Sequence, residues 1–405
     1  MSAVAAAQSP RREIEVISLV GFAHGVSHFF HLLIPPLFPW LMQEFGLSFT
    51  QAGALTAVFF AVSGIGQALA GFVVDHLGAR RVLLIGMSFF ALASVMLGSA
   101  TSYGALITAA AIAGFGNSVF HPADFTLLNR NVTGKRLGHA FSVHGLSGNL
   151  GWALSPVFLT TIAVAAGWRT AAFAAASMAV LAFVLIFIRR DTMTESRIQT
   201  ESGVPVEAAA STFTFLTSSA VWMCFVFFFL VTMAFGAMQN FAPAVLQNVY
   251  GLSLAAGATA LTSYLLGGAA GMAAGGFMVS RSEEHERRIA LVLAVSGVLA
   301  LGIASGQVPT WGLLPLMAAI GFCVGIAGPS RDMLVRRAAT ARFGQKSFGR
   351  VYGFVYSGLD AGLALAPFIF GPLMDAGLFT WVLGGFALLQ GAASLAALNV
   401  ARCAR

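Results

Sequence analysis

Long apolar segments alternate with short polar breaks along almost the whole chain. A helix that crosses about 30 Å of hydrocarbon needs roughly 20 mostly apolar residues. The chain offers twelve such segments, at residues 16–42, 50–74, 82–99, 104–128, 138–164, 168–188, 213–246, 253–279, 289–305, 310–335, 349–373 and 378–400. This pattern predicts an all-α integral membrane protein with twelve transmembrane helices.

Composition and charge agree with this pattern and orient it. Of the 405 residues, 58% are hydrophobic and 9% are charged, and the mean hydropathy is +0.84, which is outside the usual range of soluble domains. Because 21 of the 22 lysines and arginines fall on one side of the predicted spans, the positive-inside rule places both termini in the cytoplasm. The net charge of +7 therefore reflects orientation in a lipid bilayer and not nucleic-acid binding. We expect a multi-pass protein of a bacterial-type inner membrane.

The two halves of the chain are related in sequence. An offset of about 205 residues aligns the Leu-Ser pair at 47–48 with that at 252–253, and segment 114–130 with segment 321–337. Transporters are often built from such repeats. The predicted units are a cytoplasmic N-terminus (1–15), a six-helix bundle (16–188), a cytoplasmic linker (189–212), a second six-helix bundle (213–400) and a cytoplasmic tail (401–405).

The segment GFVVDHLGARR, at residues 71–81, combines a glycine, an acid four positions later, a second glycine and a basic pair. Together with the twelve spans and the repeat, it resembles the signature loop of the major facilitator superfamily, and the resemblance covers essentially the whole chain. Small residues allow close helix approach and an acid can cap or pair at a helix end. The positions that the resemblance assigns to this cytoplasmic loop and gate are Gly71, Asp75, Gly78, Arg80 and Arg81.

Two further segments resemble the fosmidomycin-resistance type of exporter within that superfamily. They are SVFHP at 118–122 and HGLSGNLGWALSP at 144–156. The chain departs from the pattern of such exporters at three positions. Leu32 stands where an acid is usual on the first helix, Ala110 replaces a helix 4 arginine, and Ser280 replaces the acid of the second signature loop. Proton coupling would therefore need other ionisable groups.

Three histidines, His24, His28 and His31, lie within about 60° of arc on the first predicted helix. One metal ion cannot contact all three, because His24 and His31 are about 10.5 Å apart along the axis and zinc–nitrogen bonds measure about 2.0–2.1 Å. One helix offers an adjacent pair at most, so we predict no dedicated metal site. Two interpretations remain, namely interhelical hydrogen bonding by neutral rings and a polar wall of a central cavity.

Polar side chains inside the other spans favour the cavity. Ionisable groups there cost about 2.5–3.5 kcal/mol on insertion scales and usually face a cavity or a partner. The candidate residues of a substrate and proton cavity are His24, His28, His31, Asn117, His121, Asp124, His144, Asn149, Gln239, Asn240, Arg331, Tyr356 and Asp360. Because imidazole titrates near pH 6.5, the proton carrier is predicted among four of them, His28, His31, His121 and Asp124.

The internal repeat suggests roles for two other positions. Asp124 falls on Arg331, so this pair could close an inner gate, although Arg331 could equally snorkel to the inner interface. Asp360 falls on Asn149 near the middle of the membrane and is the alternative proton site. Prolines in the first and seventh helices predict bends there, because proline lacks the backbone donor.

These features predict a secondary active transporter that works by alternating access. The sequence contains no phosphate-binding loop, hydrolase elbow or zinc-peptidase motif, so we predict no enzyme activity and no cofactor, with a proton gradient as the energy source. The resemblance implies proton-coupled export of a small amphiphilic or anionic toxic compound by a monomer. The alternatives are proton-coupled uptake of an organic acid or metal chelate, and a membrane sensor that transports nothing.

Overall fold

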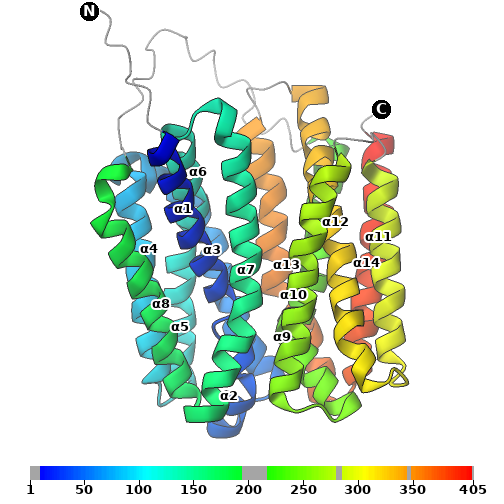
Figure 1. Cartoon of the computed structure of the whole chain (residues 1–405). Helices are drawn as coiled ribbons and strands as arrows, with labels where there is room; N and C mark the ends of the chain where they lie inside the picture. Colours follow the sequence, from blue (N-terminus) through cyan, green and yellow to red (C-terminus); the bar gives the residue numbers. More distant parts are fainter. Residues whose placement is uncertain (1–9, 194–216, 280–284, 344–347, 404–405) are drawn as a thin grey trace, which may run out of the picture.

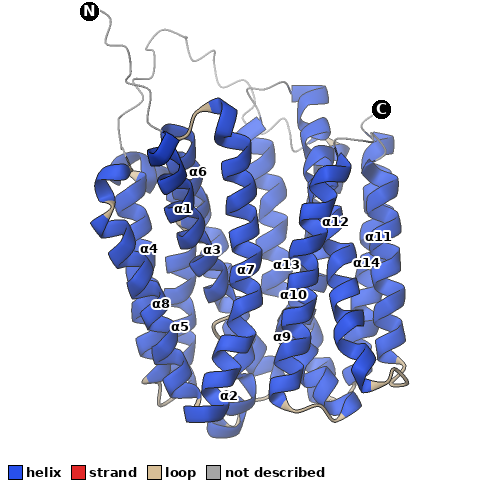
Figure 2. Ribbon diagram, viewed as in Figure 1, coloured by secondary structure: helices blue, strands red, loops and turns tan. Residues whose placement is uncertain are grey.

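The computed structural model of the chain describes residues 10–193, 217–279, 285–343 and 348–403. Within these ranges the fold consists of helices and connecting loops, with no strand (Figure 2). A helix satisfies its interior backbone hydrogen bonds within the segment itself, which the hydrocarbon of a bilayer requires. The prediction of an all-α membrane fold is confirmed.

The first half of the chain occupies the left and centre of Figure 1, coloured blue to green. Its helices are α1 (Pro10–His31), α2 (Phe38–Phe45), α3 (Phe49–Leu77), α4 (Ala79–Gly98), α5 (Tyr103–Asn117), α6 (Phe120–Asn131), α7 (Gly134–Ala166) and α8 (Trp168–Ile188). Two short 3-10 turns accompany them, η1 (Pro35–Leu37) and η2 (Arg190–Thr192).

Two of the predicted spans in this half are interrupted. The first consists of α1, the turn η1 and α2, so the bend predicted from its prolines is found as a break in the helix. The fourth is divided between α5 and α6, which the sequence did not predict. Pro122 accounts for the second break, because it lacks the N–H group that would bond to the carbonyl oxygen of Ser118.

The second half is drawn from light green to red in Figure 1. Its helices are α9 (Ser219–Tyr250), α10 (Leu254–Val279), α11 (His285–Ala304), α12 (Thr310–Phe343), α13 (Phe348–Asp375) and α14 (Phe379–Cys403). In contrast to the first span, α9 continues as one helix through its proline, Pro243.

Eleven helical segments of the described residues are long and apolar enough to cross a membrane. α10 is not among them, although its 26 residues exceed the roughly 20 that a span needs. Its many glycines lower its hydropathy and serve packing, because a Cβ atom at Gly267 or Gly271 would lie 2.1 Å from a carbonyl oxygen of α12. The multi-pass membrane protein is confirmed, and the twelfth span stays a prediction.

The internal repeat is visible in the backbone. Gly46 and Gly251 end α2 and α9 in the left-handed conformation, with φ of +63° and +68°. Two residues later, Ser48 and Ser253 each accept a hydrogen bond from the backbone N–H three positions on, at 3.2 Å in both cases. The same Gly-Leu-Ser sequence therefore ends one helix and caps the next in both halves.

The two halves meet along α3 with α13 and along α7 with α10. A Cβ atom at Gly53 would lie 2.6 Å from the ring of Pro367, and Thr262 Oγ1 donates to the carbonyl oxygen of Ala153 at 2.9 Å. α1 begins and α14 ends at the same end of the molecule (Figure 1). The bundle boundaries stay predictions, and most of the predicted linker and termini lies outside the described residues.

Candidate functional site

Four histidines and one aspartate from three helices meet inside the first half, and we call them the histidine cluster. α1 supplies His24 and His28, α6 supplies His121 and Asp124, and α7 supplies His144. The ring centroid of His24 lies 3.5 Å from that of His144, 4.3 Å from that of His28 and 5.3 Å from that of His121. All but His121 are buried.

Glycines of α7 allow this close approach. A Cβ atom at Gly151 would lie 2.0 Å from the carbonyl oxygen of Gly25, so the backbones of α1 and α7 touch there. A Cβ atom at Gly148 would lie 2.7 Å from His28 Nδ1 and 3.1 Å from His24 Nε2. Two imidazole nitrogens of α1 therefore face the same point on α7.

Asp124 connects α1 and α7 through one carboxylate oxygen. Its Oδ2 lies 3.1 Å from His24 Nδ1 and 3.1 Å from His144 Nε2, and the side chain is 0% exposed. When Asp124 is ionised both nitrogens donate, which leaves a lone pair on His24 Nε2. The other oxygen, Oδ1, has no hydrogen-bond partner among the described residues.

His121 and His28 differ in their polar contacts. His121 Nδ1 lies 3.0 Å from Gln67 Oε1 of α3, and since an amide oxygen only accepts, His121 Nε2 keeps its lone pair. Neither ring nitrogen of His28 has a hydrogen-bond partner in the described part of the chain. Sequence reasoning missed Gln67, whose signal is a pair of polar residues, Ser63 and Gln67, one turn apart on an apolar helix.

His31 is hydrogen-bonded on both ring nitrogens. Its Nε2 lies 2.9 Å from Asn117 Oδ1, and Trp152 Nε1 donates to its Nδ1 at 3.2 Å. Asn117 in turn donates to Ser63 Oγ at 2.8 Å. A ring that accepts at Nδ1 carries no proton there, so His31 is neutral and joins α1 to α5 and α7. These contacts fit interhelical hydrogen bonding, and the place of His31 in a substrate or proton cavity stays a prediction.

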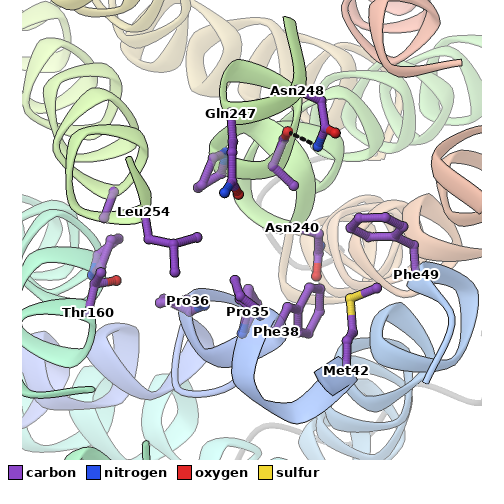
Figure 3. A pocket seen from close by; sticks show the side chains of 15 residues that line it. Pro35, Pro36, Phe38, Met42, Phe49, Thr160, Asn240, Gln247, Asn248 and Leu254 are labelled. Atoms are coloured by element: carbon purple, nitrogen blue, oxygen red, sulfur yellow. Dashed lines mark hydrogen bonds between the residues drawn. The ribbon is translucent and has the colours of Figure 1, made fainter. Parts of the chain in front are cut away.

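A cavity of about 160 Å³ lies one turn beyond His31, between the two halves. Its walls are mostly proline and other apolar side chains, with the amides of Asn240, Gln247 and Asn248 from α9 (Figure 3). It lies at the α2 end of the molecule, opposite the start of α1 (Figure 1). Asn240 was predicted and lines this cavity, whereas Gln239 is buried and is not a lining residue.

The remaining predicted residues, which are Arg331, Tyr356, Asp360 and Asn149, belong neither to the histidine cluster nor to the lining of this cavity. The Arg331 guanidinium lies 4.6 Å from the ring centroid of Phe228, and the Tyr356 ring centroid lies 4.9 Å from the same ring. Asp360 of α13 faces α3, where its Oδ2 lies 3.4 Å from a Cβ atom placed at Gly64. The gate between Asp124 and Arg331 stays a prediction. Asn149 Nδ2 donates to the carbonyl oxygen of Gly145 at 2.9 Å and lies 3.5 Å from Met272 Sδ of α10.

The signature loop forms a turn with a basic anchor. Gly78 has a φ of +90° and joins α3 to α4. Arg80 donates to the carbonyl oxygen of Arg190 at 2.7 Å, and Arg81 is exposed. The side chain of Asp75 lies outside the described residues.

Gly71 lies near the end of α3. No described atom lies within 4 Å of a Cβ atom placed there, so a close helix approach at Gly71 stays a prediction. The tight contacts of α3 occur earlier along the helix. At Gly66 a Cβ atom would lie 2.7 Å from Ser118.

Two groups of three side chains in the cluster have the spacing of metal ligands. His24, His28 and His121 form one, and His24, Asp124 and His144 form the other, with ligand atoms that all lie within 4.8 Å of one another. The distance between His24 and His31 still prevents one ion from contacting both. That argument does not apply to ligands that come from α6 and α7.

Comparison with known proteins shows which family the chain resembles. Residues 19–367 match the family described as Major Facilitator Superfamily. The fosmidomycin resistance protein of Escherichia coli K12 is 33% identical over 160 residues, which is 40% of this chain and 39% of that protein.

Two other E. coli K12 proteins match over most of their lengths. The membrane sensor protein UhpC is 22% identical over 93% of this chain and 88% of that protein. The probable L-galactonate transporter is 23% identical over 83% of this chain and 77% of that protein.

A solved structure has the same fold. It is a bacterial homolog of the human lysosomal transporter Spinster in an inward-facing, unoccupied conformation, with a TM-score of 0.74 at 14% identity over 98% of this chain and 97% of that chain. At this level of identity the likeness concerns the fold alone.

Proposed function

Because the chain belongs to the Major Facilitator Superfamily, a family of transporters and not of enzymes, we propose that it exports an amphiphilic toxic compound in exchange for protons. The exporter would work by alternating access in a bacterial inner membrane. The histidine cluster would carry the proton, and the cavity beside α2 would belong to the solute pathway.

The observation that carries the proposal is Asp124 with two histidines on one oxygen. An ionised carboxylate is expensive in hydrocarbon, and N–H groups of His24 and His144 offset part of that cost. A proton that binds at Oδ1, which has no partner among the described residues, removes the charge. The cluster can therefore hold a proton in one state and release it in another.

The position of α7 offers a route from protonation to movement. His144 bonds to Asp124 within the first half, while Ala153 of the same helix accepts a hydrogen bond from Thr262 of the second half. A change in the Asp124–His144 bond would therefore alter a helix at the boundary between halves. A proton can shift the two conformations only through such a difference in contacts.

The cavity supports an amphiphilic solute more than an anionic one. Its lining combines proline, phenylalanine and methionine with three amide side chains. No described lining residue carries a charge, whereas an anion site would use arginine, lysine or helix N-termini. The likeness of 160 residues of the chain to the fosmidomycin resistance protein favours export.

A tolerance assay tests this function. Cells that lack their own exporters and produce the wild-type chain should tolerate more of at least one compound in a panel of amphiphilic toxic compounds than cells with Asp124→Asn. His139→Ala, a change at an exposed histidine of α7, is the matched control and should keep the wild-type tolerance. Lower tolerance with the wild type, or equal tolerance with Asp124→Asn, would overturn the proposal.

Proton-coupled uptake of an organic acid is a second candidate. It is favoured by the likeness to the probable L-galactonate transporter, which extends over 83% of this chain. Uptake would make cells more sensitive to toxic acids. The solute would move into the cell together with the protons, whereas an exported solute moves against the proton flow. The same strains with a panel of sugar acids and aromatic acids therefore distinguish the two functions.

A further inference from the structure

We propose that His24, His28 and His121 form a binding site for a divalent transition-metal ion, for which Zn²⁺ is the probe. The site lies within the histidine cluster, and neither the direction nor the solute of transport enters the argument. It goes beyond proton transfer because it assigns a metal ligand to the three imidazole rings.

The spacing of the three rings fits a metal ion. Each ring offers one nitrogen, and the three nitrogens lie within 4.8 Å of one another. A tetrahedral zinc ion with bonds of about 2.0–2.1 Å holds its nitrogen ligands about 3.3 Å apart. The rings would have to rotate to close the remaining distance.

Two of the rings are held in the orientation that metal ligation needs. His24 Nδ1 is bonded to Asp124 Oδ2 at 3.1 Å, and His121 Nδ1 is bonded to Gln67 Oε1 at 3.0 Å. Each bond places the ring proton on Nδ1 and leaves the Nε2 lone pair for a ligand. Oxygen acceptors on the far nitrogen are the usual outer partners of metal-bound histidines.

His28 supplies an independent observation. It is 8% exposed, and neither of its nitrogens has a hydrogen-bond partner among the described residues. Leaving a buried polar group without a partner costs about 1–3 kcal/mol. An ion bound to one of its ring nitrogens would give His28 the partner that it lacks.

The alternative group, His24, Asp124 and His144, fits less well. An ion there would replace the two hydrogen bonds that Asp124 accepts from the histidines. An ion at His24, His28 and His121 keeps these bonds and the bond to Gln67. Asp124 then stays hydrogen-bonded to His24 and does not contact the ion itself.

The ligand set determines which ions bind. Neutral imidazoles suit zinc, copper, nickel and cobalt, whereas magnesium and calcium prefer oxygen. Protons compete with the metal because only the neutral rings bind it. The ionisable groups around the site are His31 on α1, Asp124 on α6 and His144 on α7. Zinc should therefore bind at neutral pH and be released at acidic pH, where protons take the ring nitrogens.

The first experiment uses the unmodified, full-length protein in detergent. Equilibrium dialysis should find one high-affinity Zn²⁺ per chain that excess Mg²⁺ does not displace. X-ray absorption of the complex should show about three imidazole ligands with zinc–nitrogen distances of about 2.0–2.1 Å. Absence of binding, or a zinc spectrum without imidazole scattering, would overturn the site.

The second experiment uses variants, and His28→Leu is the key one. His28 has no hydrogen bond to lose among the described residues, so this variant should fold. It should lower zinc affinity by about 100-fold, and Asp124→Asn should lower it by about 10–100-fold through the outer contact. His139→Leu, which replaces an exposed histidine, should bind zinc as the wild type does. Wild-type affinity in folded His28→Leu would contradict the proposal.

Discussion

His28 and His31 lie almost one turn apart on α1 and have opposite hydrogen-bonding environments. His31 is bonded on both ring nitrogens, by Asn117 and by Trp152. His28 has no partner on either nitrogen within the described residues. His31 therefore has a structural role, and His28 is available for a ligand.

This difference predicts opposite effects on stability. His31→Leu should lower the free energy of unfolding by about 1–3 kcal/mol, because the side chains of Asn117 and Trp152 lose a buried partner. His28→Leu should leave it unchanged or raise it, because a buried group without a partner is replaced by an apolar one. Thermal unfolding of metal-free protein in detergent measures both. An equal loss in the two variants would argue against these roles.

Gly148 provides a second test at the scale of one residue. In Gly148→Ala the new methyl group would lie 2.7 Å from His28 Nδ1 and 3.1 Å from His24 Nε2, so both rings must shift. We expect about a tenfold lower transport rate, which corresponds to about 1.4 kcal/mol, with normal amounts of folded protein.

The matched control for that variant is Gly145→Ala on the same helix. A Cβ atom at Gly145 has Met272 Sδ as its nearest neighbour at 3.9 Å, which is an ordinary contact. It should therefore transport as the wild type does. Similar losses in both variants would mean that α7 tolerates no added methyl group, and the special role of Gly148 would fail.

Residue identity alone predicted most members of the cluster, because ionisable groups are rare in apolar spans. His24, His121, Asp124 and His144 are brought together as neighbours in the structure. The sequence could not distinguish His28 from His31, since the hydrogen-bond partners of His31 come from other helices. Gln67 was missed for the same reason, because its role depends on contact between α3 and α6.

At the scale of elements, the end of α13 caps the start of α3 in the other half. Asp375 accepts hydrogen bonds from the backbone N–H groups of Phe49 and Thr50 at 2.5 and 3.0 Å, and from Thr50 Oγ1 at 2.6 Å. A carboxylate at a helix N-terminus is stabilised by the helix dipole. This contact holds the two halves together at the α2 end of the molecule, beside the cavity.

Asp375→Asn should therefore favour opening of that end. Loss of a helix cap costs about 1 kcal/mol, which is about a fivefold change in a two-state population. In a background without the native cysteines, Asn240→Cys in the cavity should react about fivefold faster with a membrane-impermeant maleimide added outside.

The control for this prediction is Glu44→Gln. Glu44 makes the same kind of contacts within the first half, accepting from Trp168 Nε1 at 2.7 Å and from Arg169 at 2.5 Å. It does not join the halves, so its loss should leave the labelling rate unchanged. Faster labelling in Glu44→Gln but not in Asp375→Asn would contradict the prediction.

The apolar pattern predicted the helices well and their interruptions only in part. The prolines of the first span indicated its break, but Pro122 so close to the end of the fourth span did not. α10 shows the converse, because glycines that permit contact with α12 also reduce the apolar signal of the span. Packing requirements and membrane hydropathy conflict there, and the sequence does not show which one dominates.

At the scale of the whole molecule, the repeat preserves architecture and not chemistry. The Gly-Leu-Ser caps recur in both halves. The alignment places Gly328 on His121 and Val355 on His144, so the second half has no copy of the histidine cluster. Proton coupling in this account is a property of the first half, and the second half provides the cavity amides and the contact at Asp375.

The most direct test of proton-coupled export is solute accumulation in proteoliposomes with an imposed pH gradient. With an interior more acidic by about 1.5 pH units, one-for-one exchange predicts accumulation of an exported solute inside to about thirtyfold, and none with the gradient reversed. Asp124→Asn should abolish the accumulation and His139→Ala should retain it. Accumulation that requires an acidic exterior, or that persists in Asp124→Asn, would contradict the account.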